Sequence, residues 1–319
     1  MTIKNVLLIG GSGFVGTQVA NRLAQLGISV TIPSRRRERD RQRQVLLLPN
    51  VQSVQANIND PGQLAGLVAS QDAVINLVGI LHTRDLKIPY SKVFETAHVE
   101  LPKKVVAACK AAGVRRLIHI RALKADAGAP SEYLRSKADG EAVVKASGLD
   151  VTIIRPSVIF GPGDSFLNTF ARFLRLLPRF YIGYGSAKFQ PVYVGDVAEV
   201  IVRSLDDASA VGQAYELVGP KVYTLRELVE YVNQVTGAHT PVRDLSMFWA
   251  HMQAGLMSLA PKPLMSPDNL RSMEVDSVAP DAKMPYGIIP KAVEAVGPTY
   301  LLGVAVKRRL DGFRLKAGR

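Results

Sequence analysis

The sequence predicts an α/β fold, in which a doubly wound parallel sheet is followed by a smaller C-terminal α/β domain. Two observations support this class. The first half of the chain repeats a strand, turn and helix pattern, and its strands are almost continuously apolar, as in sheets that helices cover on both faces. In addition, a glycine-rich turn at residues 10–16 joins the first strand to the first helix, which is typical of Rossmann-type sheets.

The predicted elements alternate along residues 4–155. Apolar residues recur in the helical segments at three- and four-residue spacing, so each of these helices has one apolar face. We expect these elements to form the first domain, over residues 1–160. The expected strands are 4–9, 28–33, 51–55, 73–78, 114–120 and 150–155, and the expected helices are 14–26, 61–69, 91–112 and 131–147.

Beyond residue 160 the alternation of strands and helices loosens. One later helix is marked at its start by a capping box, in which Thr224 and Glu227 each bond the other's backbone. We expect residues 161–302 to form mainly a smaller substrate or lid domain, with elements near 190–220 returning to the first domain and residues 303–319 forming a basic tail. The remaining expected elements are a helix at 165–177, an apolar run at 192–194 that leads into a helix at 196–205, and a helix at 224–236.

The glycine-rich turn has the context of a dinucleotide-phosphate cradle. Gly10 permits a tight turn after the strand, Gly13 lets the backbone approach a pyrophosphate, and Gly16 lets the helix pack closely on the strand. The free N–H groups and the positive dipole end of the helix then face the anion. The alternative is an ordinary glycine turn, which the strand before it and the helix after it disfavour. The expected cofactor contacts here are Gly10, Ser12, Gly13, Phe14, Val15 and Gly16.

The end of the second predicted strand indicates which nicotinamide cofactor is preferred. An acidic residue at this position binds the adenosine ribose, whereas an arginine accommodates a 2′-phosphate. Here Ser34 is followed by Arg35 and Arg36, and no carboxylate is present. The sequence therefore favours NADP(H) over NAD(H). The alternative is that these arginines form the solvated, basic start of a helix.

Tyr133 and Lys137 form the second chemical signal. Residues at i and i+4 share one face of a helix, so we expect Lys137 beside Tyr133, where its charge would lower the pKa of the phenol. A tyrosine tuned in this way exchanges a proton with a carbinol while a hydride moves to or from nicotinamide. This spacing also occurs by chance, and its place after a glycine cradle is what favours the catalytic interpretation.

Composition and charge limit the class of protein. The chain has 319 residues, 47% of them hydrophobic, which suffices for a large core. The single cysteine, Cys109, excludes intramolecular disulfides and fits a packed side chain in a reducing cytoplasm. We expect no targeting peptide, membrane-spanning run or metal site. The net charge of +13 comes without an aromatic-interleaved basic motif, so nucleic acid is not an expected partner.

Several motifs together resemble one family. The glycine pattern, residues 76–79 after the fourth strand, Tyr133 with Lys137, and residues 155–157 after the sixth strand look like an atypical extended short-chain dehydrogenase/reductase. The chain resembles the NAD-dependent epimerase/dehydratase group of that family. Within the group it is similar to the nucleotide-binding accessory subunit of respiratory complex I and its bacterial relatives. This similarity covers residues 3–302 and is carried by the segments 98–102, 133–137, 155–161, 166–168, 190–194 and 196–197.

The resemblance implies a bound NADP(H) and an association with ubiquinone metabolism or NADH:ubiquinone oxidoreductase. It also implies further cofactor contacts. Asn57 stands where many relatives have an adenine-contacting aspartate, and Pro156 and Ser157 match the segment that borders the nicotinamide ring. The other cofactor contacts that the family implies are Ile58, Leu77, Val78, Gly79, Tyr133, Lys137 and Val158.

Arg121 leaves two hypotheses about catalysis. Active members place a serine twelve residues before the tyrosine to bond the substrate carbonyl, and this chain has Arg121 there. One hypothesis is an NAD(P)-dependent oxidoreductase or epimerase/dehydratase-like enzyme, with Tyr133 as acid/base, Lys137 holding the ribose and Arg121 binding an anionic substrate. The other is a catalytically silent accessory protein whose cofactor stabilises the fold. The sequence identifies neither the substrate and reaction direction nor the oligomeric state and assembly partners.

Two C-terminal segments indicate contacts beyond the cofactor. Residues 247–260 are rich in methionine and aromatic side chains, which suits a lid over a lipophilic substrate such as a quinone, a membrane contact, or a helix packed in the smaller domain. In the tail, apolar residues at 300–306 precede six cations. We expect this tail either to lie on the inner face of an anionic membrane or to remain an ordinary soluble tail.

Overall fold

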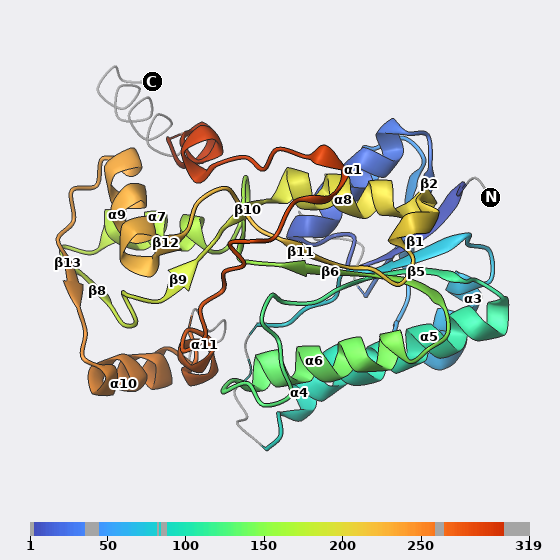
Figure 1. Ribbon diagram of the computed structural model, residues 1–319, viewed down its shortest axis with the longest axis horizontal. Helices are drawn as coiled ribbons and strands as arrows, with labels where there is room; N and C mark the ends of the chain where they lie inside the picture. Colours follow the sequence, from blue (N-terminus) through green and yellow to red (C-terminus); the bar gives the residue numbers. More distant parts are fainter. Residues whose placement is uncertain (1–2, 36–44, 82, 84–87, 259–264, 303–319) are drawn as a thin grey trace, which may run out of the picture.

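The computed structural model describes residues 3–35, 45–81, 83, 88–258 and 265–302. Its centre is a seven-stranded parallel sheet with the strand order β11-β6-β5-β4-β1-β2-β3 (Figure 1). The predicted doubly wound sheet is therefore confirmed. Its strands are β1 (Asn5–Ile9), β2 (Ser29–Ser34), β3 (Val51–Gln55), β4 (Ala73–Asn76), β5 (Arg116–Ile120), β6 (Asp150–Pro156) and β11 (Ala214–Leu217).

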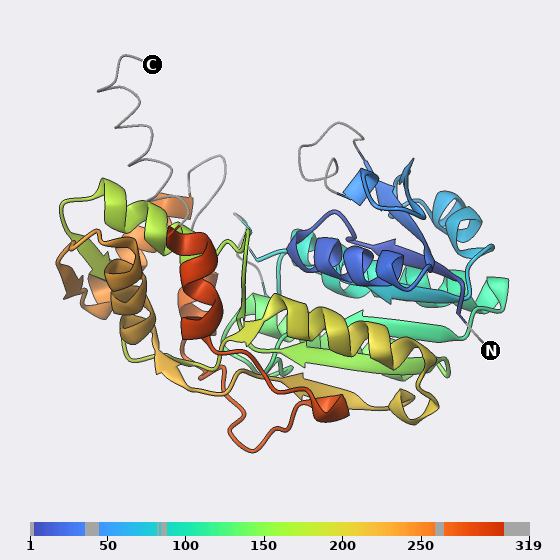
Figure 2. The same ribbon diagram turned by 90° about the horizontal axis from the view of Figure 1, so that it is seen from above.

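Helices cover both faces of the sheet, with α1 and α8 on one face and α3, α5 and α6 on the other (Figures 1 and 2). Successive side chains of a strand point to opposite faces. Accordingly, Leu8 of β1 packs in the core under α1 and α8, whereas Leu7 packs in the core under α3 and α5. The helices are α1 (Phe14–Gln25), α3 (Pro61–Val68), α5 (Leu101–Ala112), α6 (Glu132–Lys145) and α8 (Val194–Asp206).

The long helix predicted over residues 91–112 is interrupted. It consists of α4 (Lys92–Phe94), a π-helical turn η1 (Glu95–Glu100) and α5. The π-helical turn lies against α6, where a Cβ on Gly140 would come within 2.0 Å of the His98 carbonyl oxygen. Hydrophobic periodicity does not separate one π-helical turn from an α-helix, because both present apolar residues at similar spacing.

The fourth strand is shorter than the predicted 73–78. It ends at Asn76, whose side-chain Oδ1 accepts a hydrogen bond from the Val78 backbone N–H at 3.2 Å. This local bond turns the chain away from the sheet. Residues 77–80 therefore form a loop at the carboxyl edge of the sheet.

A second group of elements, which we call the small lobe, packs around its own core beside the sheet (Figure 2). The capping box predicted at its helix α9 is confirmed: the Thr224 N–H donates to Glu227 Oε2 at 2.7 Å, and the Glu227 N–H donates to Thr224 Oγ1 at 3.2 Å. The predicted domain limits remain a prediction. The lobe comprises α7 (Leu167–Leu176), β8 (Phe180–Ile182), β9 (Lys188–Phe189), β12 (Tyr223–Thr224), α9 (Leu225–Thr236), β13 (Val242–Asp244), α10 (Met247–Ser258) and α11 (Pro267–Ser272).

Two elements between residues 190 and 220 lie at the main sheet. Helix α8 packs against α1, and β11 pairs with β6 at the edge of the sheet. Residues 293–302 are also helical, and further short elements connect the parts of the fold. These short elements are β7 (Ile159–Phe160), β10 (Val192–Tyr193) and two 3-10 turns, η2 (Ala208–Ala210) and η3 (Pro285–Gly287).

Candidate functional site

The glycine-rich turn forms a backbone cradle at the carboxyl edge of the sheet. Gly10 follows β1 with a φ of +85°, a conformation that favours glycine. A Cβ on Gly16 would lie 2.3 Å from the Gly10 carbonyl oxygen, so glycine is required for α1 to start this close to β1. Gly13 is the N-cap of α1, and no side chain caps this helix. A helix start whose N–H donors lack a capping side chain fits the pyrophosphate of a dinucleotide.

The cradle lies at the point where the strand order reverses. From β1 the chain winds outward to β3 and then returns to β4 on the other side of β1. Ligands of open parallel sheets bind outside the carboxyl ends of the strands at such a switch point. Here the Leu77 N–H donates to the Ile9 carbonyl oxygen at 2.9 Å, and a Cβ on Gly10 would lie 3.3 Å from the Leu77 carbonyl carbon. The predicted cofactor contacts at Gly10 and Leu77 are thus neighbours.

The residues predicted to hold the adenosine end lie at the ends of β2 and β3. The Ala56 N–H donates to the Ser34 carbonyl oxygen at 3.0 Å, which places Asn57 next to the end of β2. Arg35 and Asn57 are exposed. Arg36 lies outside the described residues. Four further predicted contacts, Ser12, Phe14, Val15 and Ile58, are half-buried.

Lys137 lies beside the loop that follows β4. Its Nζ donates a hydrogen bond to the Val78 carbonyl oxygen at 3.0 Å, and a Cβ on Gly79 would come within 3.3 Å of the same Nζ. The side chain is buried, and this desolvation lowers the pKa of the Lys137 ammonium to about 8. The structure therefore brings three predicted cofactor contacts, Val78, Gly79 and Lys137, to one place.

Tyr133 lies one helical turn before Lys137 on α6. Its ring makes edge-to-face contacts with the rings of Phe94 and His98, at centroid distances of 6.2 and 5.7 Å. Burial raises the pKa of the Tyr133 phenol to about 12. The expectation that Lys137 lowers the pKa of the Tyr133 phenol is therefore wrong for this structure, because desolvation disfavours the tyrosinate. Tyr133 is a protonated phenol at neutral pH.

Arg121, which follows β5, has a different environment from the one predicted. Its guanidinium is bonded to Glu141 and to two carbonyl oxygens of the turn after β5. Burial raises the pKa of Glu141, but hydrogen bonds from Arg155, Lys145 and Arg121 outweigh it and lower the pKa to about 2. These bonds indicate a structural role for Arg121, which links the turn after β5 to α6. This geometry does not support the expectation that the charge of Arg121 faces a substrate carbonyl.

The segment predicted to border the nicotinamide is tied to the C-terminal part of the chain. Pro156 and Ser157 are buried. The Ser157 hydroxyl donates to the Ser277 carbonyl oxygen at 2.7 Å, and the Val192 N–H donates to the Val158 carbonyl oxygen at 3.0 Å. The Ser157 hydroxyl therefore makes a contact within the protein.

Helix α11 supplies two residues near the site that the sequence analysis missed. The Asp268 carboxylate is fully buried and accepts the backbone N–H groups of Glu132 and Tyr133, at 2.7 and 3.0 Å. Asn269 donates from Nδ2 to the Leu81 carbonyl oxygen at 3.0 Å. A signal for the helix itself was present, because Ser266 and Asn269 form a capping box. The contact of Asp268 with α6 joins residues about 135 positions apart, for which the sequence carries no local sign.

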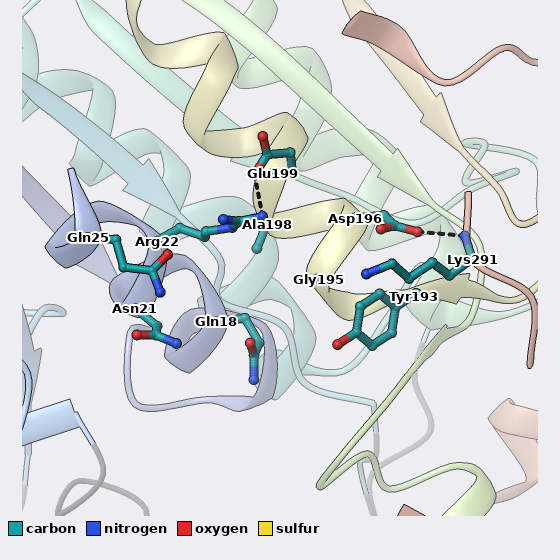
Figure 3. A pocket seen from close by; sticks show the side chains of 10 residues that line it. All are labelled: Gln18, Asn21, Arg22, Gln25, Tyr193, Gly195, Asp196, Ala198, Glu199 and Lys291. Carbon is teal, nitrogen blue, oxygen red and sulfur yellow. Dashed lines mark hydrogen bonds and ion pairs between the residues drawn. The ribbon is translucent and has the colours of Figure 1, made fainter. Parts of the chain in front are cut away.

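A cavity of about 250 Å³ lies between α1 and α8 (Figure 3). Its wall includes an ion pair, Arg22 with Glu199 at 2.8 Å, and a hydrogen bond from the Lys291 N–H to Asp196 at 2.8 Å. Helices α1 and α8 cover one face of the sheet, whereas α6, with the predicted catalytic pair, covers the other (Figure 1). This cavity is therefore separate from the predicted substrate site.

Comparisons with known proteins agree with this fold and with the cradle. The NADH dehydrogenase (ubiquinone) 1 alpha subcomplex subunit 9 of Mus musculus is 34% identical over 279 residues, covering 86% of this chain and 72% of that protein. A (4-alkanoyl-5-oxo-2,5-dihydrofuran-3-yl)methyl phosphate reductase of Streptomyces griseus is 29% identical over 283 residues, covering 86% of this chain and 90% of the reductase. Both are similar over most of the chain.

Solved structures show the same fold at lower sequence identity. The enzyme WbmH of Bordetella bronchiseptica, in complex with NAD+, has a TM-score of 0.67 at 20% identity and covers 93% of this chain and 97% of its own. The profile of the NAD dependent epimerase/dehydratase family matches residues 6–217, a range that contains the glycine cradle, the loop after β4 and the Tyr133–Lys137 pair. On this match the chain belongs to the NAD-dependent epimerase/dehydratase family.

Proposed function

We propose that this protein binds NADP(H) and reduces a carbonyl compound, as an oxidoreductase of the extended short-chain dehydrogenase/reductase type. The observation that carries the proposal is the position of Lys137, which lies against Val78 and Gly79 at the switch point of the sheet, one turn after Tyr133. The relatives named as NADH dehydrogenase subunits support an association with NADH:ubiquinone oxidoreductase or ubiquinone metabolism. The proposed substrate is lipophilic or anionic: the NADH:ubiquinone relatives support a lipophilic compound, and the Streptomyces reductase, which is named for a phosphate ester, supports an anionic one.

Tyr133 is suited to donate a proton. Because burial raises its pKa to about 12, the phenol is protonated at neutral pH. A reduced nicotinamide bound at the switch point would supply the hydride to the carbonyl carbon. The Tyr133 phenol would give its proton to the carbonyl oxygen, while Lys137 would hold the ribose through its ammonium donors. In this protonation state the phenol can act as the general acid of the proposed reduction.

The test is to purify the protein, release any bound nucleotide and identify it. The nicotinamide absorbance of the protein with NADPH is then followed while carbonyl compounds and quinones are added, including carboxylated and phosphorylated ones. Loss of the reduced-nicotinamide absorbance with one of these compounds supports the proposed reductase activity. A protein that binds neither NADPH nor NADH contradicts the proposal as a whole.

The preference for NADP(H) is proposed from the exposed Arg35 at the end of β2. Replacing Arg35 by alanine should weaken NADPH binding by about ten- to hundredfold and change NADH binding little, because a hydrogen bond to a charged group contributes roughly 1.5–3 kcal/mol. Affinities are measured by nicotinamide fluorescence. Arg115→Ala is a matched control, since this exposed arginine pairs with Asp150 at the amino end of β6, away from the carboxyl ends of the strands. Equal affinities of the unaltered protein for NADPH and NADH would contradict the proposed preference for NADP(H).

The second candidate is a redox-silent accessory protein, which the environment of Arg121 favours. This arginine stands in place of the serine that active relatives use, and its guanidinium is bonded within the protein. Such a protein would bind NADP(H) for stability alone. NADPH would then raise the midpoint of thermal unfolding of the protein. In the absorbance assay, no added compound would oxidise the NADPH.

A peripheral membrane contact is proposed from the exposed face of α10. This helix contains no charged residue, and it packs on the lobe through Ala250 and Ala254, while Phe248 is 70% and Leu256 is 73% exposed. Of the side chains on α10, Ala250 and Ala254 are packed in the small lobe, as the alternative of a packed helix requires, whereas Phe248 and Leu256 are not. The exposed Arg243 shortly precedes α10, and the chain has a net charge of +13, which suits anionic lipid. The other large apolar side chains exposed on α10 are Met247, Trp249 and Met252.

The predicted tail contact, at residues 303–319, lies outside the described residues. None of the described helices is both long and apolar enough to cross a bilayer. The proposed location is the cytoplasm, with contact at the inner face of the membrane.

The membrane contact predicts that the protein sediments with liposomes containing anionic lipid. Replacing Phe248 and Trp249 by serine should reduce the bound fraction several-fold, because these rings would no longer be removed from water. Leu26→Ser is the control, since Leu26 is 65% exposed at the end of α1, away from this helix. The contact is rejected if the Phe248/Trp249 variant binds as the unaltered protein does, or if neither binds. A chain truncated after Gly303 tests the tail in the same assay.

A further inference from the structure

We infer that His98 is a positioning residue of the dinucleotide site, which fixes the loop after β4 to α6 so that the loop backbone stays aligned with Tyr133 and Lys137. The inference rests on the proposed function, because it assigns a role in holding the dinucleotide. His98 lies in the π-helical turn η1 and is 2% exposed. Single π-helical turns are often found at functional sites.

The hydrogen bonds of His98 define its tautomer. Nε2 accepts the backbone N–H of Ile80 at 3.0 Å, so Nε2 carries no proton. The proton is therefore on Nδ1, which donates to the Ser136 hydroxyl at 2.8 Å. The Ser136 hydroxyl in turn donates to the Tyr133 carbonyl oxygen at 2.9 Å. This chain of bonds runs from the loop after β4, through one imidazole, to the first turns of α6.

Packing holds the imidazole in this place. Its ring stacks on Phe94 at a centroid distance of 5.4 Å and meets the edge of the Tyr133 ring at 5.7 Å. On the backbone side, the His98 carbonyl oxygen lies so close to Gly140 that any side chain there would collide with it. His98 thus contacts α6 at two levels, near Ser136 and at Gly140.

Lys137 and His98 both bond the loop after β4, and they have different roles. Lys137 holds it at the Val78 carbonyl oxygen, and His98 holds it at the Ile80 N–H, two residues later. Lys137 also has to serve the ribose in the proposed function. His98 stays neutral, because burial, and then the charges of Lys137 and His119, lower its pKa to about 2. With both ring nitrogens bonded inside the protein, His98 acts on the loop and not on the ligand.

Two substitutions separate the two bonds of the imidazole. In His98→Gln the amide oxygen reaches the position of Nε2 and still accepts the Ile80 N–H, whereas in His98→Asn the shorter amide reaches only the position of Nδ1 and still donates to Ser136. We expect His98→Asn to weaken NADPH binding by about tenfold, the loss of roughly one hydrogen bond. His98→Gln should bind NADPH within about threefold of the unaltered protein. Affinity is measured by nicotinamide fluorescence, and the unfolding midpoint of each variant is measured without ligand.

The controls separate positioning from stability and from the proposed function. His251→Asn is the matched control, because His251 lies on α10 and its Nδ1 bonds the Met247 carbonyl oxygen within the same helix. If both His98 variants lose unfolding midpoint but keep NADPH affinity, His98 is merely structural and the inference is overturned. If His98→Asn does not fold, a folded His98→Gln protein with tenfold weaker binding also overturns it, and one with retained binding supports it. If the unaltered protein binds no NADPH, the proposed function fails first.

Discussion

Replacing Tyr133 by phenylalanine is expected to lower the turnover of the reacting carbonyl compound by about 10²–10⁴-fold, the usual contribution of one general acid. The substitution removes the phenol proton and little else. The ring keeps its contacts with Phe94 and His98, and the backbone N–H of residue 133 keeps its bond to Asp268. NADPH affinity should therefore stay within about twofold of the unaltered protein. The rate is measured as loss of reduced-nicotinamide absorbance at saturating NADPH.

Tyr181→Phe is the control for this substitution, because Tyr181 lies on β8 in the small lobe and its side chain is exposed. It should keep the full rate. A Tyr133→Phe protein with the full rate would reject Tyr133 as the proton donor, whatever the identity of the substrate.

Replacing Lys137 by methionine is expected to weaken NADPH binding by about ten- to hundredfold. Methionine fills a similar apolar space, so the core beside α6 stays packed, but the charged donor next to Val78 is lost. A hydrogen bond from a charged group contributes roughly 1.5–3 kcal/mol, which corresponds to this range. Lys103→Met is the control, since this exposed lysine on α5 pairs with Glu100. Unchanged NADPH affinity in the Lys137→Met protein would contradict the assigned site.

The same lysine predicts how NADPH affinity depends on pH. Burial lowers the pKa of Lys137 to about 8 in the free protein, and an anionic dinucleotide favours its ammonium form. Below this pH Lys137 is already charged and adds no pH dependence. Above it, binding must take up a proton, so affinity falls by up to about tenfold per pH unit until the higher pKa of the complex is reached. Titrations from neutral to alkaline pH should show this fall in the unaltered protein and not in Lys137→Met.

The parts of the site that were predictable depend on local signals. Glycine at positions 10, 13 and 16, between an apolar strand and an amphipathic helix, is a pattern within about a dozen residues, and the structure has the cradle there. The capping box at Thr224 and the helix that carries Tyr133 were predictable for the same reason. The interruption of the helix at His98 was not, because a π-helical turn keeps nearly the same apolar spacing.

The sequence by itself therefore determined the parallel sheet, the phosphate cradle and the residue types at its edge, because periodicity, glycine turns and caps act over a few residues. Only the tertiary structure decided what those side chains face. Lys137 faces the Val78 carbonyl oxygen, Arg121 faces Glu141, and Asp268 bonds the start of α6, about 135 residues earlier in the chain. It also decided the pKa of Tyr133, since the pKa of a phenol depends on how deeply packing removes it from water, and no spacing along the chain records that depth.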